Sequence, residues 1–134
     1  MSRNFIELNS SQKAFDIFKS LMPGIKDVRG VSIEFDFGSY SHIADDRQIL
    51  QRIRHIKSTL INPDEIRQSH HKGMQFREIY MSDFYEDEYD LHPEPFLVVA
   101  DVRVMRRFWT AILPTPGYLN NVKKGKLIWS SPEK

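Results

Sequence analysis

Five histidines are the first candidates for chemistry, because an imidazole changes its protonation state near neutral pH and can act as a general acid or base. They are His42, His55, His70, His71 and His92. On a helix over residues 45–60, the apolar side chains cluster within about 40°, whereas His55 falls near 240°, on the polar side. We therefore expect His55 either on a solvated helix face or in a groove as an acid or base. His42 either belongs to a turn or acts as its partner.

The adjacent pair His70 and His71 is a weaker candidate, because neighbouring side chains on a strand point to opposite faces. The sequence also has no cysteine, no HExxH and no calcium-binding loop. It contains neither a glycine-rich phosphate loop nor a GxSxG elbow. We therefore expect no metal and no cofactor.

Basic and aromatic residues form a second set of candidates, because cations hold phosphates and aromatic rings stack on bases. By strict alternation, Arg77 shares a strand face with Ile79, and Thr110 shares one with Phe108 and Ile112. The other members of the set are Arg54 on the long helix, Tyr118, and Lys126 in a lysine cluster. The alternative, in which the aromatic rings are core and the lysines are solvated, stays open.

The composition indicates one soluble domain over residues 1–134. Apolar residues are 40% and charged residues 28% of the 134 positions, and the net charge is +1. No apolar run is long enough for a membrane span, and the first residues have no signal-peptide core, so we expect a cytoplasmic protein. The charge is segregated, with +3 over residues 1–77, −7 over 78–100 and +5 over 101–134.

Helices precede strands in the predicted order of elements. Apolar spacing predicts helices over residues 10–22 and 45–60, the second with Asp45 as its cap, and a short helix over 64–68. Alternation predicts strands over 31–37, 75–81, 96–102 and 107–113, an acidic loop over 83–95, and a last hairpin from 117–121 and 126–129. This order predicts an α+β fold, with N-terminal helices on one face of a mostly antiparallel sheet of about four or five strands.

One segment resembles a known family. The string from Arg52 to Arg67, with Arg54-His55 followed by Asn62-Pro63-Asp64-Glu65-Ile66, resembles the barnase–EndoU–colicin–RelE-like group of small phage- and toxin-associated ribonucleases. The later segments 77–80, 96–102 and 108–112 fit the same pattern. The resemblance covers about residues 40–130, after an N-terminal helix and lead-in over 1–30.

The resemblance implies cleavage of RNA without a metal. A base takes the proton of the ribose 2′-hydroxyl, its oxygen attacks the phosphorus, and an acid protonates the leaving 5′-oxygen to give a 2′,3′-cyclic phosphate. It implies catalytic roles for His55, His42, Arg77 and Thr110. The substrate-binding candidates are Tyr80, which shares the strand position that contacts phosphate, and Lys126, together with Arg54 and Tyr118.

Two interpretations of the biological role stay open. The chain could be a toxin or mobile-element nuclease that acts on RNA, with tRNA as a candidate target and an immunity or antitoxin protein as a candidate partner. It could instead be a non-catalytic module that binds nucleic acid or a protein through its segregated charges. The oligomeric state is left open.

Overall fold

The computed structural model of the chain describes residues 1–7 and 11–132. In chain order its helices and strands are α1 (Ser11–Lys19), β1 (Ile25–Lys26), β2 (Ser32–Ile33), α2 (Phe37–Tyr40), α3 (Arg47–Gln51), α4 (Ile53–Ile61), β3 (Glu65–Gln68), β4 (Arg77–Phe84), β5 (Glu94–Asp101), β6 (Arg107–Ile112), α5 (Pro116–Val122) and β7 (Leu127–Ser130). Strands β1 and β2 form a small ribbon, and the other five form the main sheet.

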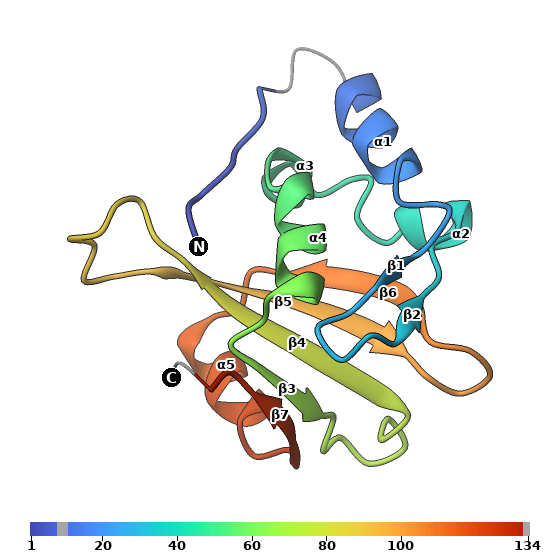
Figure 1. Ribbon diagram of the computed structural model, residues 1–134, viewed down its shortest axis with the longest axis vertical. Coiled ribbons are helices and arrows are strands. Elements are labelled where there is room, and N and C mark those ends of the chain that lie inside the picture. Colours follow the sequence, from blue (N-terminus) through green and yellow to red (C-terminus); the bar gives the residue numbers. More distant parts are fainter. Residues whose placement is uncertain (8–10, 133–134) are drawn as a thin grey trace.

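The main sheet has the order β6-β5-β4-β3-β7, and all of its neighbouring strands are antiparallel (Figure 1). Strands β3 to β6 follow one another in space as in sequence, which agrees with the short connections between them. In the long pair β4-β5, Arg77 lies opposite Asp101 and Ile79 lies opposite Val99. The expected α+β fold with an antiparallel five-stranded sheet is confirmed.

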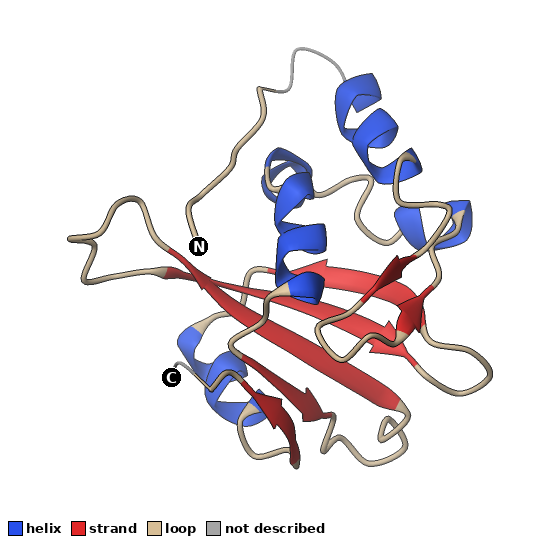
Figure 2. Cartoon of the chain, viewed as in Figure 1, coloured by secondary structure: helices blue, strands red, loops and turns tan. Residues whose placement is uncertain are grey.

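The two faces of the sheet are covered differently (Figure 2). The N-terminal helices cover one face, where Ile53, Ile56 and Leu60 of α4 are fully buried in the main core. On the other face, which we call the outer face, α5 packs Leu119 and Val122 on a smaller cluster formed by Ile79, Met81, Leu97 and Val99. No helix of the described residues is long and apolar enough to cross a membrane. The outer face therefore has one short helix as cover, which leaves room beside it.

The long predicted helix is divided into α3 and α4 at Arg52. Asp46, not Asp45, caps α3 and accepts a hydrogen bond of 3.1 Å from the N–H of Ile49. Arg52 has a non-helical backbone, with φ −108° and ψ 23°, and its guanidinium pairs with Glu94 of β5. This ion pair anchors the break to the sheet.

Residues 64–68 contain strand β3 and not the short helix that Pro63 suggested. Ile66 is fully buried and lies opposite Tyr80 on one side and Trp129 on the other. A strand here joins β4 to β7 and satisfies the backbone of both, whereas a one-turn helix would leave those strand edges open.

Three further predicted elements are corrected. The strand expected over 31–37 is reduced to β2, because Asp36 caps α2 and accepts the N–H of Ser39. The strand expected over 117–121 is α5, capped by Thr115 with a proline in its first turn. The helix expected over 10–22 is α1, which ends at Lys19, and residue 10 lies outside the described residues.

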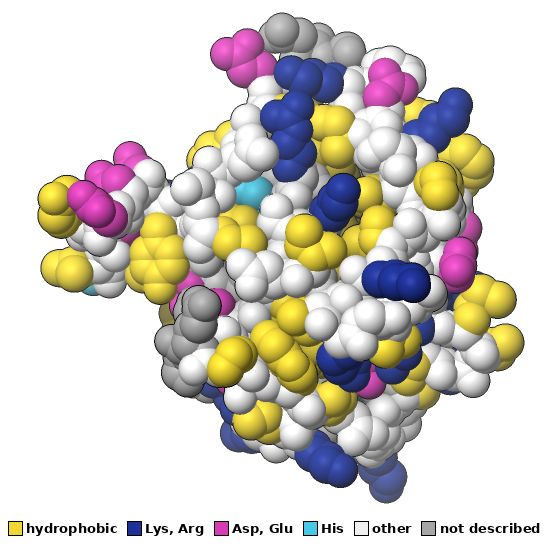
Figure 3. Space-filling model, viewed as in Figure 1, with side chains coloured by type: hydrophobic (Ala, Val, Ile, Leu, Met, Phe, Trp, Pro, Cys, Tyr) yellow, Lys and Arg dark blue, Asp and Glu magenta, His cyan; other side chains and the backbone are white. Residues whose placement is uncertain are grey.

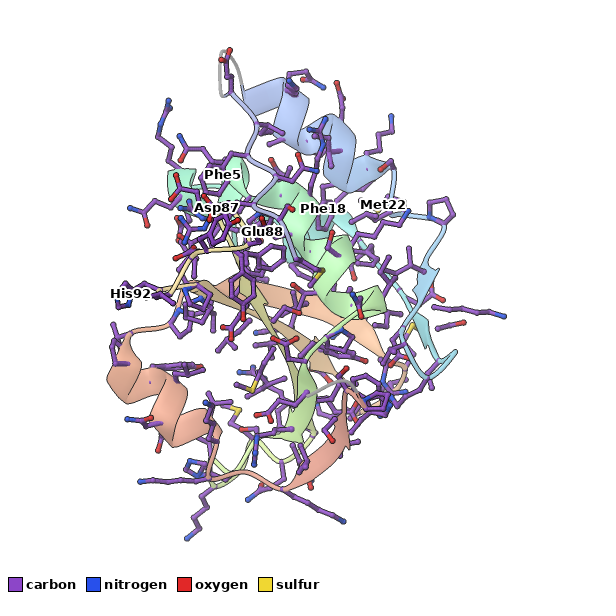
Figure 4. The ribbon with its side chains drawn as sticks, turned by 60° about the vertical axis from the view of Figure 1, so that its left-hand side comes forward. Phe5, Phe18, Met22, Asp87, Glu88 and His92 are labelled. Atoms are coloured by element: carbon purple, nitrogen blue, oxygen red, sulfur yellow. The ribbon has the colours of Figure 1, made fainter. Side chains whose placement is uncertain are left out.

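The acidic segment is the tip of the β4-β5 hairpin, whose strands extend to Phe84 and resume at Glu94. Asp90 orders the tip by accepting the N–H groups of Glu86 and His92 and by pairing with Arg3 at 3.2 Å. Figure 3 shows the hairpin projecting from the body with carboxylates on its surface, and Figure 4 labels Asp87, Glu88 and His92 there. The exposed acidic loop thus has a defined shape.

Candidate active site

A hollow of about 90 Å³ opens on the outer face beside α5, and we call it the α5 pocket. Its apolar floor comes from Ile79, Val99 and Ile112 on three neighbouring strands. Polar side chains from the β3-β4 loop, β4, β6 and α5 surround this floor: Ser69, His70, His71, Arg77, Thr110, Tyr118 and Asn121. Chemically capable groups from four separate stretches of chain therefore meet in one place.

A second hollow, of about 260 Å³, lies on the other flank of α5. Its polar lining includes the carboxylates of Asp64, Glu65 and Asp83, with Lys123 as a cation. Like charges repel, so this acidic lining disfavours a phosphate group. The smaller α5 pocket, which contains an arginine and no carboxylate among its lining residues, is the better site for an anion.

Arg77 is the cation of the α5 pocket, and none of the described residues pairs with it as an anion. Among the described residues its side chain makes no hydrogen bond or ion pair, and its Nε is buried without an acceptor. The guanidinium carbon lies 4.9 Å from the ring centroid of Trp109 and 5.5 Å from that of Phe76. A half-buried cation without a counter-ion is costly, so this side chain is prepared to receive an anion.

A β-bulge in β6 brings Thr110 into the same pocket. Val99 lies opposite Thr110 and Ala100 lies opposite Phe108, so Trp109 is an extra residue between two paired ones. Thr110 therefore shares the outer face with Ile112, as predicted, whereas Phe108 is buried in the main core. The expectation that Thr110 and Phe108 share a face is wrong, because strict alternation does not hold across a bulge.

His70 and His71 line the α5 pocket together. Their ring centroids are 5.6 Å apart and the planes differ by 10°. The expected divergence does not occur, because both residues lie in the loop between β3 and β4 and not on a strand. Nε2 of His70 lies 3.1 Å from Oδ1 of Asn121 on α5. Sequence reasoning named this pair only as a weaker candidate, although a glycine, Gly73, follows it, and Gly73 adopts a φ of +83° in the turn.

One comparison with known proteins places the chain in a family. A model of the family described as phage-Barnase-EndoU-ColicinE5/D-RelE like nuclease2 matches residues 13–130. The chain belongs to this nuclease family. The resemblance inferred from the sequence is thereby confirmed, and all residues of the α5 pocket lie inside the matched range. No curated protein and no solved structure matches the chain.

The structure does not bring His55 to the α5 pocket. Its side chain is 0% exposed and stacks on Phe84 with ring centroids 3.8 Å apart. Nε2 accepts the N–H of Asn4 at 2.9 Å, and burial lowers the pKa of His55 to about 4. The expected polar helix face is wrong, because the N-terminal segment, which carries the labelled Phe5 in Figure 4, and the sheet cover that side of α4.

His42 lies outside the α5 pocket but close to it. It is exposed in the turn after α2, and its ring centroid is 4.4 Å from that of Trp109. Trp109 in turn contacts the guanidinium of Arg77. His42 therefore contacts Trp109, which contacts Arg77, but His42 does not itself line the α5 pocket.

Tyr80 and Arg54 lie on the helix-covered side. Tyr80 is fully buried and donates its hydroxyl to Asp27 at 2.7 Å, and its burial raises the pKa of the phenol. Arg54 is exposed on α4 and lies 3.5 Å from Oδ1 of Asn4. Neither residue lines the α5 pocket, so the structure separates them from Arg77 and Thr110.

Of the two remaining candidates, Tyr118 lines the α5 pocket and Lys126 does not. Tyr118 is 39% exposed. Lys126 is exposed in the turn before β7, and its carbonyl accepts the N–H of Gln68, close in sequence to His70. Within residues 1–7 and 11–132, no three His, Cys, Asp or Glu side chains gather so that they could hold a metal ion.

Proposed function

We propose that this member of the nuclease family is a metal-independent endoribonuclease and that the α5 pocket is its active site. The observation that supports the proposal is the meeting of Arg77, a cation without a counter-ion, with Thr110 and two imidazoles in one hollow. Phosphoryl transfer from RNA requires these groups: a base, an acid and donors for the charged phosphorus centre.

The proposed reaction is an internal transfer. A neutral imidazole takes the proton of the ribose 2′-hydroxyl, and the 2′-oxygen forms a bond to the adjacent phosphorus. The bond between phosphorus and the 5′-oxygen breaks, and an imidazolium gives its proton to that oxygen. The products are a 2′,3′-cyclic phosphate and a free 5′-hydroxyl. Arg77 and the Thr110 hydroxyl donate to the phosphoryl oxygens, whose negative charge grows in the transition state.

His70 and His71 are the proposed acid–base pair. They take the place that the resemblance assigned to His55 and His42, because they line the same hollow as Arg77 and the other two do not. Tyr118 is proposed to stack on a base next to the cleaved bond, and Lys126 to hold a neighbouring phosphate. Arg54 and Tyr80 have no part in this proposal.

The test is incubation of the folded protein with tRNA and total RNA in EDTA, followed by mass analysis of the fragment ends. We expect cyclic phosphate ends from the wild-type chain and about a hundredfold or greater loss of cleavage in His70→Gln/His71→Gln. His92→Gln, which removes an exposed imidazole from the acidic hairpin, is the matched control and should cleave normally. Salt-dependent binding of RNA without cleavage would instead support the non-catalytic binding module.

A further inference from the structure

Arg77 has a carboxylate directly opposite it and does not bind it. Arg77 of β4 and Asp101 of β5 are register partners, and directly opposed residues of antiparallel strands share a face. Arg107 of β6 is the partner of Asp101 on the other side. Asp101 thus lies between two arginines, yet it forms its ion pair with a third, Arg103.

Arg103 holds Asp101 through both backbone and side chain. Its N–H donates to Oδ1 of Asp101 at 3.0 Å, and its Nη2 donates to Oδ2 at 2.8 Å. Burial by itself raises the pKa of this carboxyl, but the hydrogen bonds from Arg103 outweigh it and lower the pKa. The carboxylate is therefore charged and already occupied.

Trp109 contacts the guanidinium of Arg77, with 4.9 Å between the guanidinium carbon and the ring centroid. The bulge in β6 turns the indole toward the outer face, where it packs on the cluster below α5. The indole contacts both the guanidinium of Arg77 and the exposed ring of His42. Bulges commonly redirect a side chain next to an active site, and here the redirected side chain is the one that contacts the pocket's cation.

We propose that Arg103 and Trp109 are positioning residues that keep Arg77 free for a phosphate group. Arg103 acts by occupying Asp101, and Trp109 acts by holding the guanidinium at the pocket. Neither residue lines the α5 pocket itself. This inference rests on the proposed function, in which Arg77 binds the substrate phosphate.

The first experiment releases Asp101. The probe is inorganic phosphate, and the readout is the NMR signal of the Arg77 Nε–H during titration. Arg107→Gln is the background and the control, because it removes the other arginine opposite Asp101 without releasing the carboxylate. Adding Arg103→Gln should let Asp101 capture Arg77 and weaken phosphate binding about tenfold. Adding Asp101→Asn to these two changes should restore binding to within about twofold.

The second experiment removes the indole ring that contacts the guanidinium of Arg77. Trp109→Leu keeps an apolar side chain on the outer cluster but has no ring for the guanidinium, and it should weaken phosphate binding about tenfold. Trp109→Phe keeps a ring and should lose much less. Backbone amide spectra of every variant verify that the sheet is intact before binding is compared.

The results separate this inference from the proposed function. Phosphate binding that is equal in Arg107→Gln and Arg103→Gln/Arg107→Gln, or a folded triple variant that fails to recover it, would overturn the role of Arg103. Phosphate binding by Trp109→Leu that is as tight as that of the wild-type chain would overturn the role of Trp109. A wild-type chain that binds phosphate through Arg77 but cleaves no RNA would overturn the proposed function and leave the positioning intact.

Discussion

The backbone N–H of Asn4 donates a hydrogen bond of 2.9 Å to Nε2 of His55, whose side chain has no exposed surface. This bond requires Nε2 to be an unprotonated acceptor, so the side chain of His55 is a neutral imidazole in the folded chain. Residues 1–7 are further tied to the hairpin, since the N–H of Arg3 donates to Tyr85 and that of Tyr85 to Met1. His55 is therefore the anchor of the N-terminal segment.

The first prediction concerns stability against pH. Burial lowers the pKa of His55 from 6.5 to about 4 in the folded chain, so between these values the unfolded chain binds more protons. The contribution of His55 is complete above pH 6.5 and is lost as the pH falls toward 4. Urea unfolding should show about 2 to 3 kcal/mol less stability from this group at pH 4.5 than at pH 7.5.

His55→Phe provides the comparison for this prediction. The new ring can still stack on Phe84, but it cannot titrate, and Asn4 loses its acceptor. We expect lower stability at neutral pH, by about 1 to 2 kcal/mol, and a much flatter dependence on pH. The same slope in both proteins would show that His55 is not the titrating group.

The second prediction separates Tyr80 from the active site. Its hydroxyl donates to Asp27, and hydrogen bonds from Tyr80 and Arg29 outweigh burial to lower the pKa of that carboxyl. Tyr80→Phe should cost about 1 to 2 kcal/mol in the free energy of unfolding, measured in urea. Cleavage per folded molecule should not change. A large loss of cleavage at unchanged stability would return Tyr80 to the site.

The third prediction concerns Tyr118. If its ring stacks on a base, Tyr118→Ala should raise KM for RNA by about tenfold or more and leave kcat nearly unchanged. Tyr89→Ala, which removes an exposed tyrosine from the acidic hairpin, is the matched control. Steady-state kinetics on a short single-stranded RNA would distinguish the two. Equal KM values for the two variants would exclude stacking by Tyr118.

The fourth prediction concerns the close contact between Gly125, in the turn before β7, and the backbone of Gln68 in β3. A Cβ added to Gly125 would lie 2.0 Å from the carbonyl oxygen of Gln68, which is backbone and cannot turn aside. Gly125→Ala should therefore destabilise the chain by more than about 2 kcal/mol in thermal or urea unfolding. Gly117→Ala on α5 meets no atom within 4 Å and should be neutral or slightly stabilising. Similar stability of the two variants would contradict the packing of β3 against the α5-β7 turn.

Local patterns predicted the elements whose own residues decide them. The apolar repeat of Ile53, Ile56 and Leu60 predicted the helix that covers the core, and the continuous run in β5 predicted a central strand. The strand β3 was missed because its structure depends on pairing with β4 and β7. The residues of β3 and its immediate neighbours in sequence carry no information about that pairing.

The positions of the candidate site residues were predicted in part, because alternation and helical spacing describe only local structure. Alternation placed Arg77 on the correct face with Ile79. It could not place Trp109, because one extra residue in β6 shifts all later faces, nor His55, because the segment that buries it lies about fifty positions away. His70 and His71 were undervalued because the divergence expected of neighbours on a strand does not apply to the β3-β4 loop that carries them.

The most direct test of the central claim uses one short RNA and the same RNA with a single 2′-deoxy nucleotide at the cleaved position, both in EDTA. The wild-type chain should cleave the first to a 2′,3′-cyclic phosphate and leave that bond intact in the second. Arg77→Gln should lower kcat for the first by about a hundredfold or more. Equal cleavage of both substrates would contradict attack by the 2′-hydroxyl, and full activity of Arg77→Gln would contradict an active site in the α5 pocket.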